Sequence, residues 1–188
     1  MGFVDTLEPD ARAEFDRLPD GARVTVERLG MAKIPHEGPW FLETWRSPET
    51  LEGPAAARYP SPRTLGTAIL AVITHEAFSA MHRLRTDELW HFHAGSALEL
   101  VLLGPGGEAR VERLGLELDA GALPQRRVPA GTWMGARPVA PAPDGWALIG
   151  NTLAPGFEYE DYEPGERAAL ETGWPEEAER IRALTRGE

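Results

Sequence analysis

The stretch 82-HRLRTDELWHFHAG-95 carries three of the chain's five histidines and predicts two strands joined by a tight turn. Side chains alternate between the two faces of a strand, so over 88-ELWHFHA-94 Glu88 lies on one face and His91 and His93 lie on the other. If Glu88 faces the interior, this His-x-His pair faces outward and serves a structural role, although it looks like two metal ligands. A bulge in the strand would reverse that parity and bring His93 into a pocket, so both arrangements stay open.

Short apolar runs continue on both sides of this stretch, with turn residues between them. Gly104-Pro105-Gly106-Gly107 predicts one hairpin turn. Closely spaced strands with no helix between them favour a sandwich or a small barrel. The predicted strands are 67-TAILAVIT-74, 78-FSAMHRL-84, 88-ELWHFHA-94, 97-ALELVLL-103, 109-ARVERLGL-116, 125-QRRVPA-130, 132-TWMGARPV-139 and 146-WALIGNTLA-154.

The flanking segments predict a few further elements. Apolar residues recur at helical intervals over 7–19, whereas 22–31 and 40–47 alternate as strands do. Residues 47–62 form a loop rich in proline and alanine, either variable surface or a lid. Proline at the start and glycine at the end of 164–173 and 175–187 predict two surface helices.

Composition limits the classes of protein to consider. A chain of 188 residues with 42% hydrophobic content fits one globular domain. Its net charge of −11 disfavours binding to nucleic acid, and no apolar run is long enough for a membrane span. The N-terminus is acidic, unlike a signal peptide, so we expect a cytoplasmic protein. Without cysteine, a metal site would need histidine, carboxylate or carbonyl ligands.

The opening stretch resembles the first motif of the cupins, in which His-x-His is followed by glutamate and then glycine. Aligned on Glu88 and Gly95, the first histidine falls on His82 and the second on Leu84. Residues 121–134 resemble the second motif, with Met134 at the histidine position and two extra residues before Pro129.

Four separated blocks extend the resemblance over about residues 30–165: 36–47, 78–95, 124–133 and 152–163. They resemble a group of small cupins catalogued as a domain of unknown function, related to the RmlC-like dTDP-sugar 3,5-epimerase and germin barrels. The resemblance implies an all-β double-stranded β-helix, a single-domain jelly roll spanning 1–188. A helix would occupy about 1–20 and two more would occupy 164–187. It also implies a homodimer.

The resemblance further implies a metal held by three histidines and a glutamate, and this sequence departs from that set. Leucine is no ligand and a thioether is a weak one for iron, manganese or zinc. Only His82 and Glu88 remain as ligands, unless a distant residue such as Glu43 or His36 completes the shell. We therefore expect no metal cofactor; if one binds, His82 and Glu88 hold it.

His82 and Glu88 are instead the candidate catalytic residues, because a histidine near a carboxylate in an apolar barrel suits acid–base chemistry. The alternative is a structural pair left from an ancestral metal site. Arg46 at the barrel mouth would clamp a carboxylate or phosphate, or else form a rim salt bridge. The remaining candidate ligand-binding residues are Glu43, Trp90, Phe92, His93, Gln125, Thr132, Met134, Asn151, Phe157 and Tyr159, with Tyr162 beside the last.

Two hypotheses on function follow. The first is a metal-independent isomerase, epimerase or lyase acting on a sugar-like or other polar metabolite, with His82 as base or acid and Glu88 orienting it. The second is a ligand-binding cupin without turnover, in which the same residues only form hydrogen bonds. A metal-dependent oxygenase is disfavoured by Leu84 and Met134.

Overall fold

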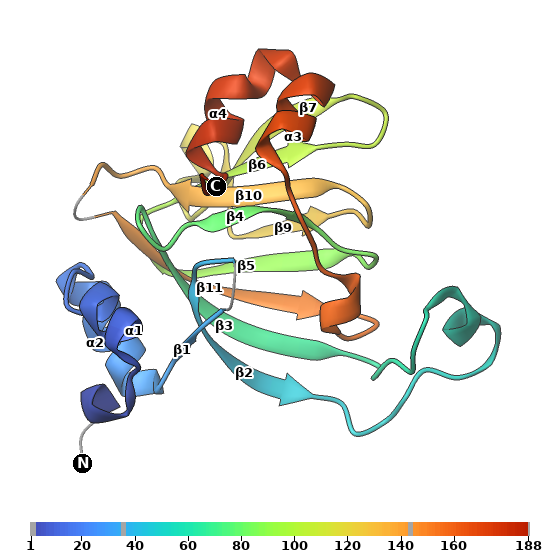
Figure 1. Ribbon diagram of the computed structural model, residues 1–188, viewed down its shortest axis with the longest axis horizontal. Coiled ribbons are helices and arrows are strands. Elements are labelled where there is room, and N and C mark those ends of the chain that lie inside the picture. Colours follow the sequence, from blue (N-terminus) through green and yellow to red (C-terminus); the bar gives the residue numbers. More distant parts are fainter. Residues whose placement is uncertain (1–2, 35–36, 143–144, 188) are drawn as a thin grey trace.

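Two six-stranded sheets pack face to face in the computed structural model, which describes residues 3–34, 37–142 and 145–187 (Figure 1). Neighbouring strands run antiparallel, except for the short pair β7–β8. The first sheet has the order β1 (Ala32–Lys33), β2 (Trp40–Arg46), β3 (Thr67–Thr74), β11 (Trp146–Leu153), β5 (Glu88–Gly95) and β9 (Gln125–Val128). The second has the order β12 (Glu163–Pro164), β4 (Ser79–Arg83), β10 (Trp133–Pro138), β6 (Leu98–Leu103), β7 (Ala109–Leu114) and β8 (Ala122–Leu123).

This arrangement confirms the predicted jelly roll with short terminal helices. Each of the eight runs predicted between 67 and 154 contains a strand of the structure. The predicted hairpin turn joins β6 to β7, where the Gly107 amide donates to the Gly104 carbonyl at 3.0 Å. Gly107 has a φ of +88°, which glycine adopts without the strain that a Cβ would cause.

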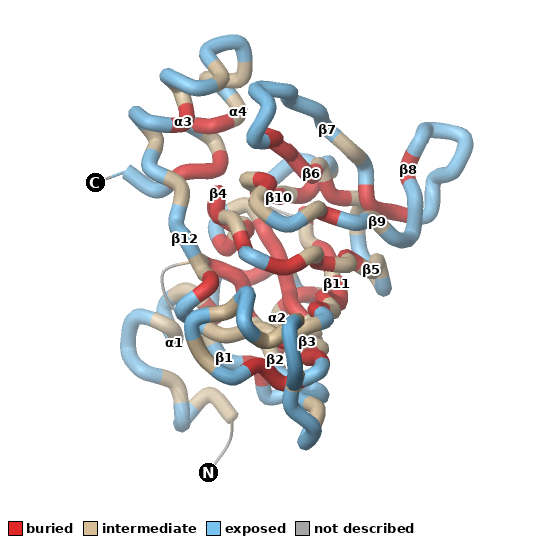
Figure 2. The backbone as a smooth tube through the Cα atoms, turned by 90° about the vertical axis from the view of Figure 1, so that its right-hand side faces the viewer, coloured by how far each residue is buried: buried red, intermediate tan, exposed pale blue. Residues whose placement is uncertain are grey.

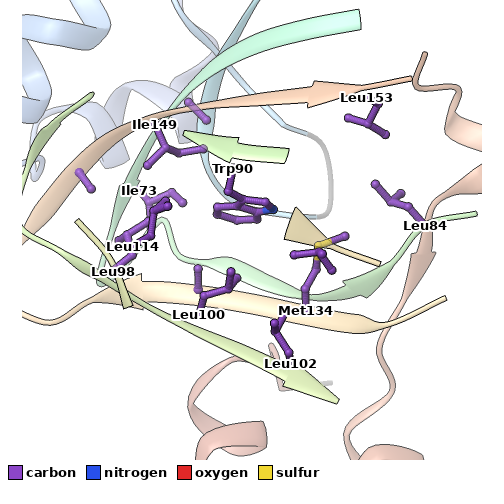
Figure 3. Packing of buried hydrophobic residues seen from close by; sticks show 14 residues of the cluster. Ile73, Leu84, Trp90, Leu98, Leu100, Leu102, Leu114, Met134, Ile149 and Leu153 are labelled. Atoms are coloured by element: carbon purple, nitrogen blue, oxygen red, sulfur yellow. The ribbon is translucent and has the colours of Figure 1, made fainter. Parts of the chain in front are cut away.

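The main core lies between the two sheets and follows from side-chain alternation (Figure 3). Trp90 and Ile149 enter it from the first sheet, and Leu100 and Met134 enter it from the second. Strand β6 is apolar except for Glu99, because its alternate residues Val101 and Leu103 face a further cluster on the outer side. The core fills one part of the space between the sheets and leaves the rest for the cavity described below.

Helices cover part of the outer face of each sheet. The first sheet is covered by η1 (Phe3–Thr6), α1 (Pro9–Phe15) and α2 (Asp20–Leu29), and the second by α3 (Arg167–Gly173), η5 (Pro175–Glu177) and α4 (Ala178–Ala183). Further short 3-10 turns are η2 (Gly53–Arg58), η3 (Leu118–Ala120) and η4 (Tyr159–Asp161). Most buried residues lie in the two sheets, and exposed residues are frequent in the loops, on the helices and along the outer strands (Figure 2). No described helix is both long enough and apolar enough to cross a membrane.

The prediction of a strand over 22–31 was wrong, since these residues form most of α2. Ala22 and Val26, four residues apart, are completely buried, whereas Val24 between them is 54% exposed. A helix produces that pattern because residues i and i+4 share a face, while a strand would bury all three. The helix ends at Gly30, whose left-handed φ of +63° forms the C-cap.

Candidate functional site

A cavity of about 360 Å³ lies between the sheets, beside the main core. Apolar side chains form most of its wall, including Phe41, Ile69 and Ile149 from the first sheet. The volume falls within the range of small-molecule sites, which combine apolar walls with a few polar groups. The polar and charged residues that line it are Glu37, Glu43, Arg46, Thr67, Ser79, His82, Glu88, Asn151, Tyr159 and Tyr162.

His82 lies on β4 and is 3% exposed. Its Nδ1 lies 2.7 Å from the backbone carbonyl of Ala80. A carbonyl can only accept, so Nδ1 is the donor and carries the proton, which leaves Nε2 of the neutral ring with a free lone pair. The ring also stacks on Tyr162, with centroids 5.4 Å apart and planes 25° apart. His82 is therefore held in one orientation and one tautomer.

Glu88 begins β5 on the opposite wall and is 6% exposed. Its Oε2 accepts a hydrogen bond of 2.7 Å from Nε1 of Trp90, two residues along the same face. Burial raises the pKa of Glu88 to about 7, with Glu37 adding to the rise and with His82 and the Trp90 hydrogen bond opposing it. A carboxyl group with this pKa exchanges its proton near neutral pH, as a general acid or base requires.

Glu37 is a cavity residue that the sequence did not indicate. It lies in the loop between β1 and β2, and its Oε1 accepts a hydrogen bond of 2.8 Å from Ser79 on β4. Loop residues have no periodicity, so the one available signal was the position of Glu37 in the block 36–47 that carried the resemblance. Tyr162 was named only beside Tyr159, yet Tyr162 contacts His82, while Tyr159 lines the cavity with 60% of its surface exposed.

Glu43 and Arg46 both line the cavity, although strict alternation would place them on opposite faces of β2. A bulge between Glu43 and Trp45 shifts the register against β3 and brings Arg46 to the inner side. Arg46 then donates to both carboxylate oxygens of Glu43, at 3.1 and 2.9 Å, and to Glu158 at 2.9 Å. These hydrogen bonds and charges raise the pKa of Arg46. The expected clamp for an anionic ligand is thus engaged by the protein's own carboxylates.

Asn151 lies on β11, is 4% exposed and lines the cavity. Among the described residues, its Nδ2 has no hydrogen-bond acceptor. A buried donor without a partner costs about 1–3 kcal/mol, so native proteins seldom leave one unsatisfied without a functional reason.

Five expected ligand-binding residues are not among the described residues that line the cavity: Phe92, His93, Gln125, Thr132 and Met134. Phe92 packs against the main core, and Met134 lies within it. Thr132 is buried just before β10, at 5% exposure. Gln125 lies on the edge strand β9, where its amide contacts Nδ1 of His91 at 3.0 Å.

The His-x-His pair lies on the outer face of the first sheet. The irregularity in β5 comes after Phe92, so alternation holds from Glu88 to that residue and His91 points outward to Thr152 at 3.2 Å. His93 lies on the same side, over Gly150, where an added Cβ would be 2.8 Å from its Nε2. Burial, and to a smaller extent His93, lower the pKa of His91. The alternative that placed His93 in the pocket does not match this geometry.

The residues present do not fit the metal centre of cupins. Leu84 and Met134, at two ligand positions, are packed in the main core. His82 uses Nδ1 for a backbone carbonyl, and Glu88 has one oxygen engaged by Trp90. Within residues 3–34, 37–142 and 145–187, no three histidine or carboxylate side chains are grouped as metal ligands. His36, considered as a distant ligand, lies outside the described residues.

Comparisons with known proteins agree with this architecture. The chain is similar to the protein SO0799 from Shewanella oneidensis, known from an X-ray crystal structure, with 32% identity, a TM-score of 0.75, and coverage of 88% of this chain and 97% of that one. It is also similar to a hypothetical protein from Leishmania major, with 27% identity, a TM-score of 0.77, and coverage of 88% and 99%. No curated protein matches. Residues 23–164 match the family described as Cupin superfamily (DUF985). The chain therefore belongs to this DUF985 family of the cupin superfamily.

Proposed function

We propose that this cupin binds a small polar metabolite in the cavity and catalyses a metal-independent proton transfer, as an isomerase, epimerase or lyase does. The observation that carries the proposal is the pairing of two groups in one cavity. One is a histidine whose Nε2 lone pair is free because its Nδ1 bonds to the Ala80 carbonyl. The other is Glu88, a carboxyl group with a pKa of about 7.

The two groups have complementary roles in this proposal. His82 Nε2 removes a proton from a carbon or hydroxyl group of the substrate, and the protonated carboxyl of Glu88 supplies one. Trp90 fixes the orientation of Glu88 through its hydrogen bond, and Tyr162 supports the imidazole ring by stacking. The apolar wall limits the access of water, which strengthens the electrostatic interactions between these groups and a bound ligand.

Proton transfer at a carbon atom leaves an isotopic trace that does not require the product to be known. The protein is incubated in D2O with a defined mixture of sugars, sugar alcohols and amino sugars, and each compound is analysed by mass spectrometry and proton NMR. We expect the wild type to incorporate deuterium at one carbon of at least one compound. His82→Gln, which removes the base, should reduce that rate by at least about 100-fold.

The control is His93→Gln, which changes a histidine on the outer face and should leave the rate unchanged. Native mass spectrometry of the same mixture tests binding separately from turnover. A compound that binds the wild type without isotope exchange contradicts the catalytic proposal and supports a ligand-binding cupin without turnover. Exchange that survives His82→Gln contradicts the assigned base.

A further inference from the structure

Acidic side chains outnumber basic ones among the described residues that line the cavity. Glu37, Glu43 and Glu88 line it, while Arg46 is the one arginine or lysine among its described lining residues. Arg46 is already paired with Glu43 and with Glu158. A phosphate or carboxylate entering the cavity would therefore meet the carboxylate of Glu37 with no unpaired arginine or lysine among the described lining residues to neutralise it.

Glu37 is a carboxylate with no arginine or lysine partner among the described residues that line the cavity. Its Oε1 accepts a hydrogen bond from the neutral hydroxyl of Ser79. Arg186 lies nearby, but it donates to the backbone carbonyl of Glu37 at 3.2 Å and rests over the ring of Phe78. Glu37, Glu88 and Tyr162 line the same cavity. Burial raises the pKa values of Glu88 and Tyr162, and the negative charge of Glu37 adds to both rises, while Arg186 opposes the rise for Tyr162.

On the opposite wall of the cavity, Asn151 indicates a second property of the ligand, a hydrogen-bond acceptor. Its neighbours across the sheet are Ile69 on β3 and Trp90 on β5, and the next inward-facing pair along β5 and β11 is Glu88 with Leu153. Asn151, which is 4% exposed, therefore lies on the same face of the first sheet as Glu88 and diagonally across from it, and its Nδ2 has no acceptor among the described residues. It requires a hydrogen-bond acceptor, which a hydroxyl or carbonyl group supplies.

We propose that the ligand is a small amine that also carries a hydroxyl or carbonyl group, with its ammonium at Glu37 and its oxygen at Asn151. This inference rests on the proposed use of the cavity as the binding site, and it narrows the substrate class. Because Glu37 lies in the loop beside β4 and Asn151 lies on the first sheet, the ligand spans the cavity. The carbon atoms between its two polar groups then lie in the cavity that His82 and Glu88 also line. Phosphorylated compounds, nucleotide sugars included, are excluded by charge.

The test is competitive binding to the full chain from an equimolar mixture, read by native mass spectrometry. The mixture contains glucosamine, glucose and glucose 6-phosphate, together with 2-aminoethanol, ethylene glycol and glycolate, so that each amine has a neutral and an anionic counterpart. We expect at least one amine to be retained at least about tenfold above both counterparts, as one charge-assisted hydrogen bond would give. Retention of no amine, or equal retention of a neutral or anionic counterpart, overturns the proposal.

Glu37→Gln keeps the acceptor for Ser79 and removes the charge, so it should lower retention of the amine by at least about tenfold and leave the neutral compounds unchanged. Glu108→Gln, on the exposed β6–β7 hairpin, is the matched control and should change nothing. Unchanged retention of the amine by Glu37→Gln overturns the assignment. A variant that fails to fold leaves the wild-type competition as the deciding result.

The two proposals fail separately. If a neutral compound is retained equally well and exchanges deuterium through His82, the amine inference is wrong and the acid–base function stands. If an amine is retained selectively without exchange, the ligand class is right and the catalytic proposal is wrong.

Discussion

Replacing Glu88 with glutamine should remove a pH-dependent loss of stability that the wild type shows. The pKa of Glu88 is about 7 in the folded protein, against an ordinary value of 4.5. A difference of that size corresponds to about 3 kcal/mol, since each pKa unit is worth about 1.4 kcal/mol. The cause is mainly burial, which penalises the ionised carboxylate.

The sign follows from proton binding. Between pH 4.5 and about 7 the folded protein keeps a proton on Glu88 that the unfolded chain has released. Stability therefore falls as the pH rises through this window and levels off above it. Glu88→Gln is neutral throughout and still offers Trp90 an acceptor, so the variant should match the wild type near pH 4 and exceed it by about 3 kcal/mol at pH 8.

The assay is urea-induced unfolding of both proteins at a series of pH values from 4 to 8.5, followed by tryptophan fluorescence. Subtracting the two free energies of unfolding cancels every other titration that the proteins share. Glu108→Gln, with the same chemical change at an exposed position, should show a difference near zero at every pH. If the difference between Glu88→Gln and the wild type stays constant within about 1 kcal/mol over this pH range, Glu88 does not have a raised pKa in the folded protein.

Three further outcomes are expected. Arg63→Met should lower the free energy of unfolding by about 3 kcal/mol in urea titrations, because Arg63 is 1% exposed and donates two hydrogen bonds to the buried Asp161. Its removal leaves Asp161 with the more distant Arg85, at 3.6 Å, as its ion-pair partner among the described residues. By the same measurement, Val26→Ala should lower the free energy of unfolding by about 1–3 kcal/mol, and Val24→Ala should lower it by less than about 0.5 kcal/mol. Equal losses would contradict the burial pattern of α2. Elemental analysis should find no stoichiometric iron, manganese or zinc in untagged wild type purified without chelator. The double variant Leu84→His, Met134→His should bind more metal than the wild type. Stoichiometric metal in the wild type would contradict the conclusion that these residues do not form a cupin metal centre.

The strands were predictable because their physics is local. Alternation of apolar and polar side chains requires no knowledge of distant partners, so the runs from 67 to 154 indicated strands, and the placement of Glu88 and His91 on opposite faces followed from the same period. The strand prediction for 22–31 was wrong because Ala22, Val24 and Val26 alternate as they would in a strand, while Ala22 and Val26 are also four residues apart, as on one face of a helix. Only packing against the first sheet distinguishes the two, and that contact is long-range.

The residues that line the cavity were less predictable, because their positions depend on strand register and on contacts between distant parts of the chain. The inward position of Arg46 depends on a bulge in β2, and Glu37 reaches the cavity from a loop that carries no periodic signal. Met134 occupies a ligand position of the motif but lies in the packed core. A motif therefore located His82 and Glu88, while the cavity around them depends on register and loop geometry.

The position of the proton on the His82 ring decides whether His82 can act as the base, because the proposed base is its Nε2 lone pair. The measurement is a two-bond ¹⁵N–¹H correlation spectrum of the wild type, recorded at a pH where the ring is neutral and assigned by comparison with His82→Gln. We expect a proton on Nδ1, bonded to the Ala80 carbonyl, and a free lone pair on Nε2. A proton on Nε2 of the neutral ring would contradict this expectation, because His82 would then have no base to offer the cavity.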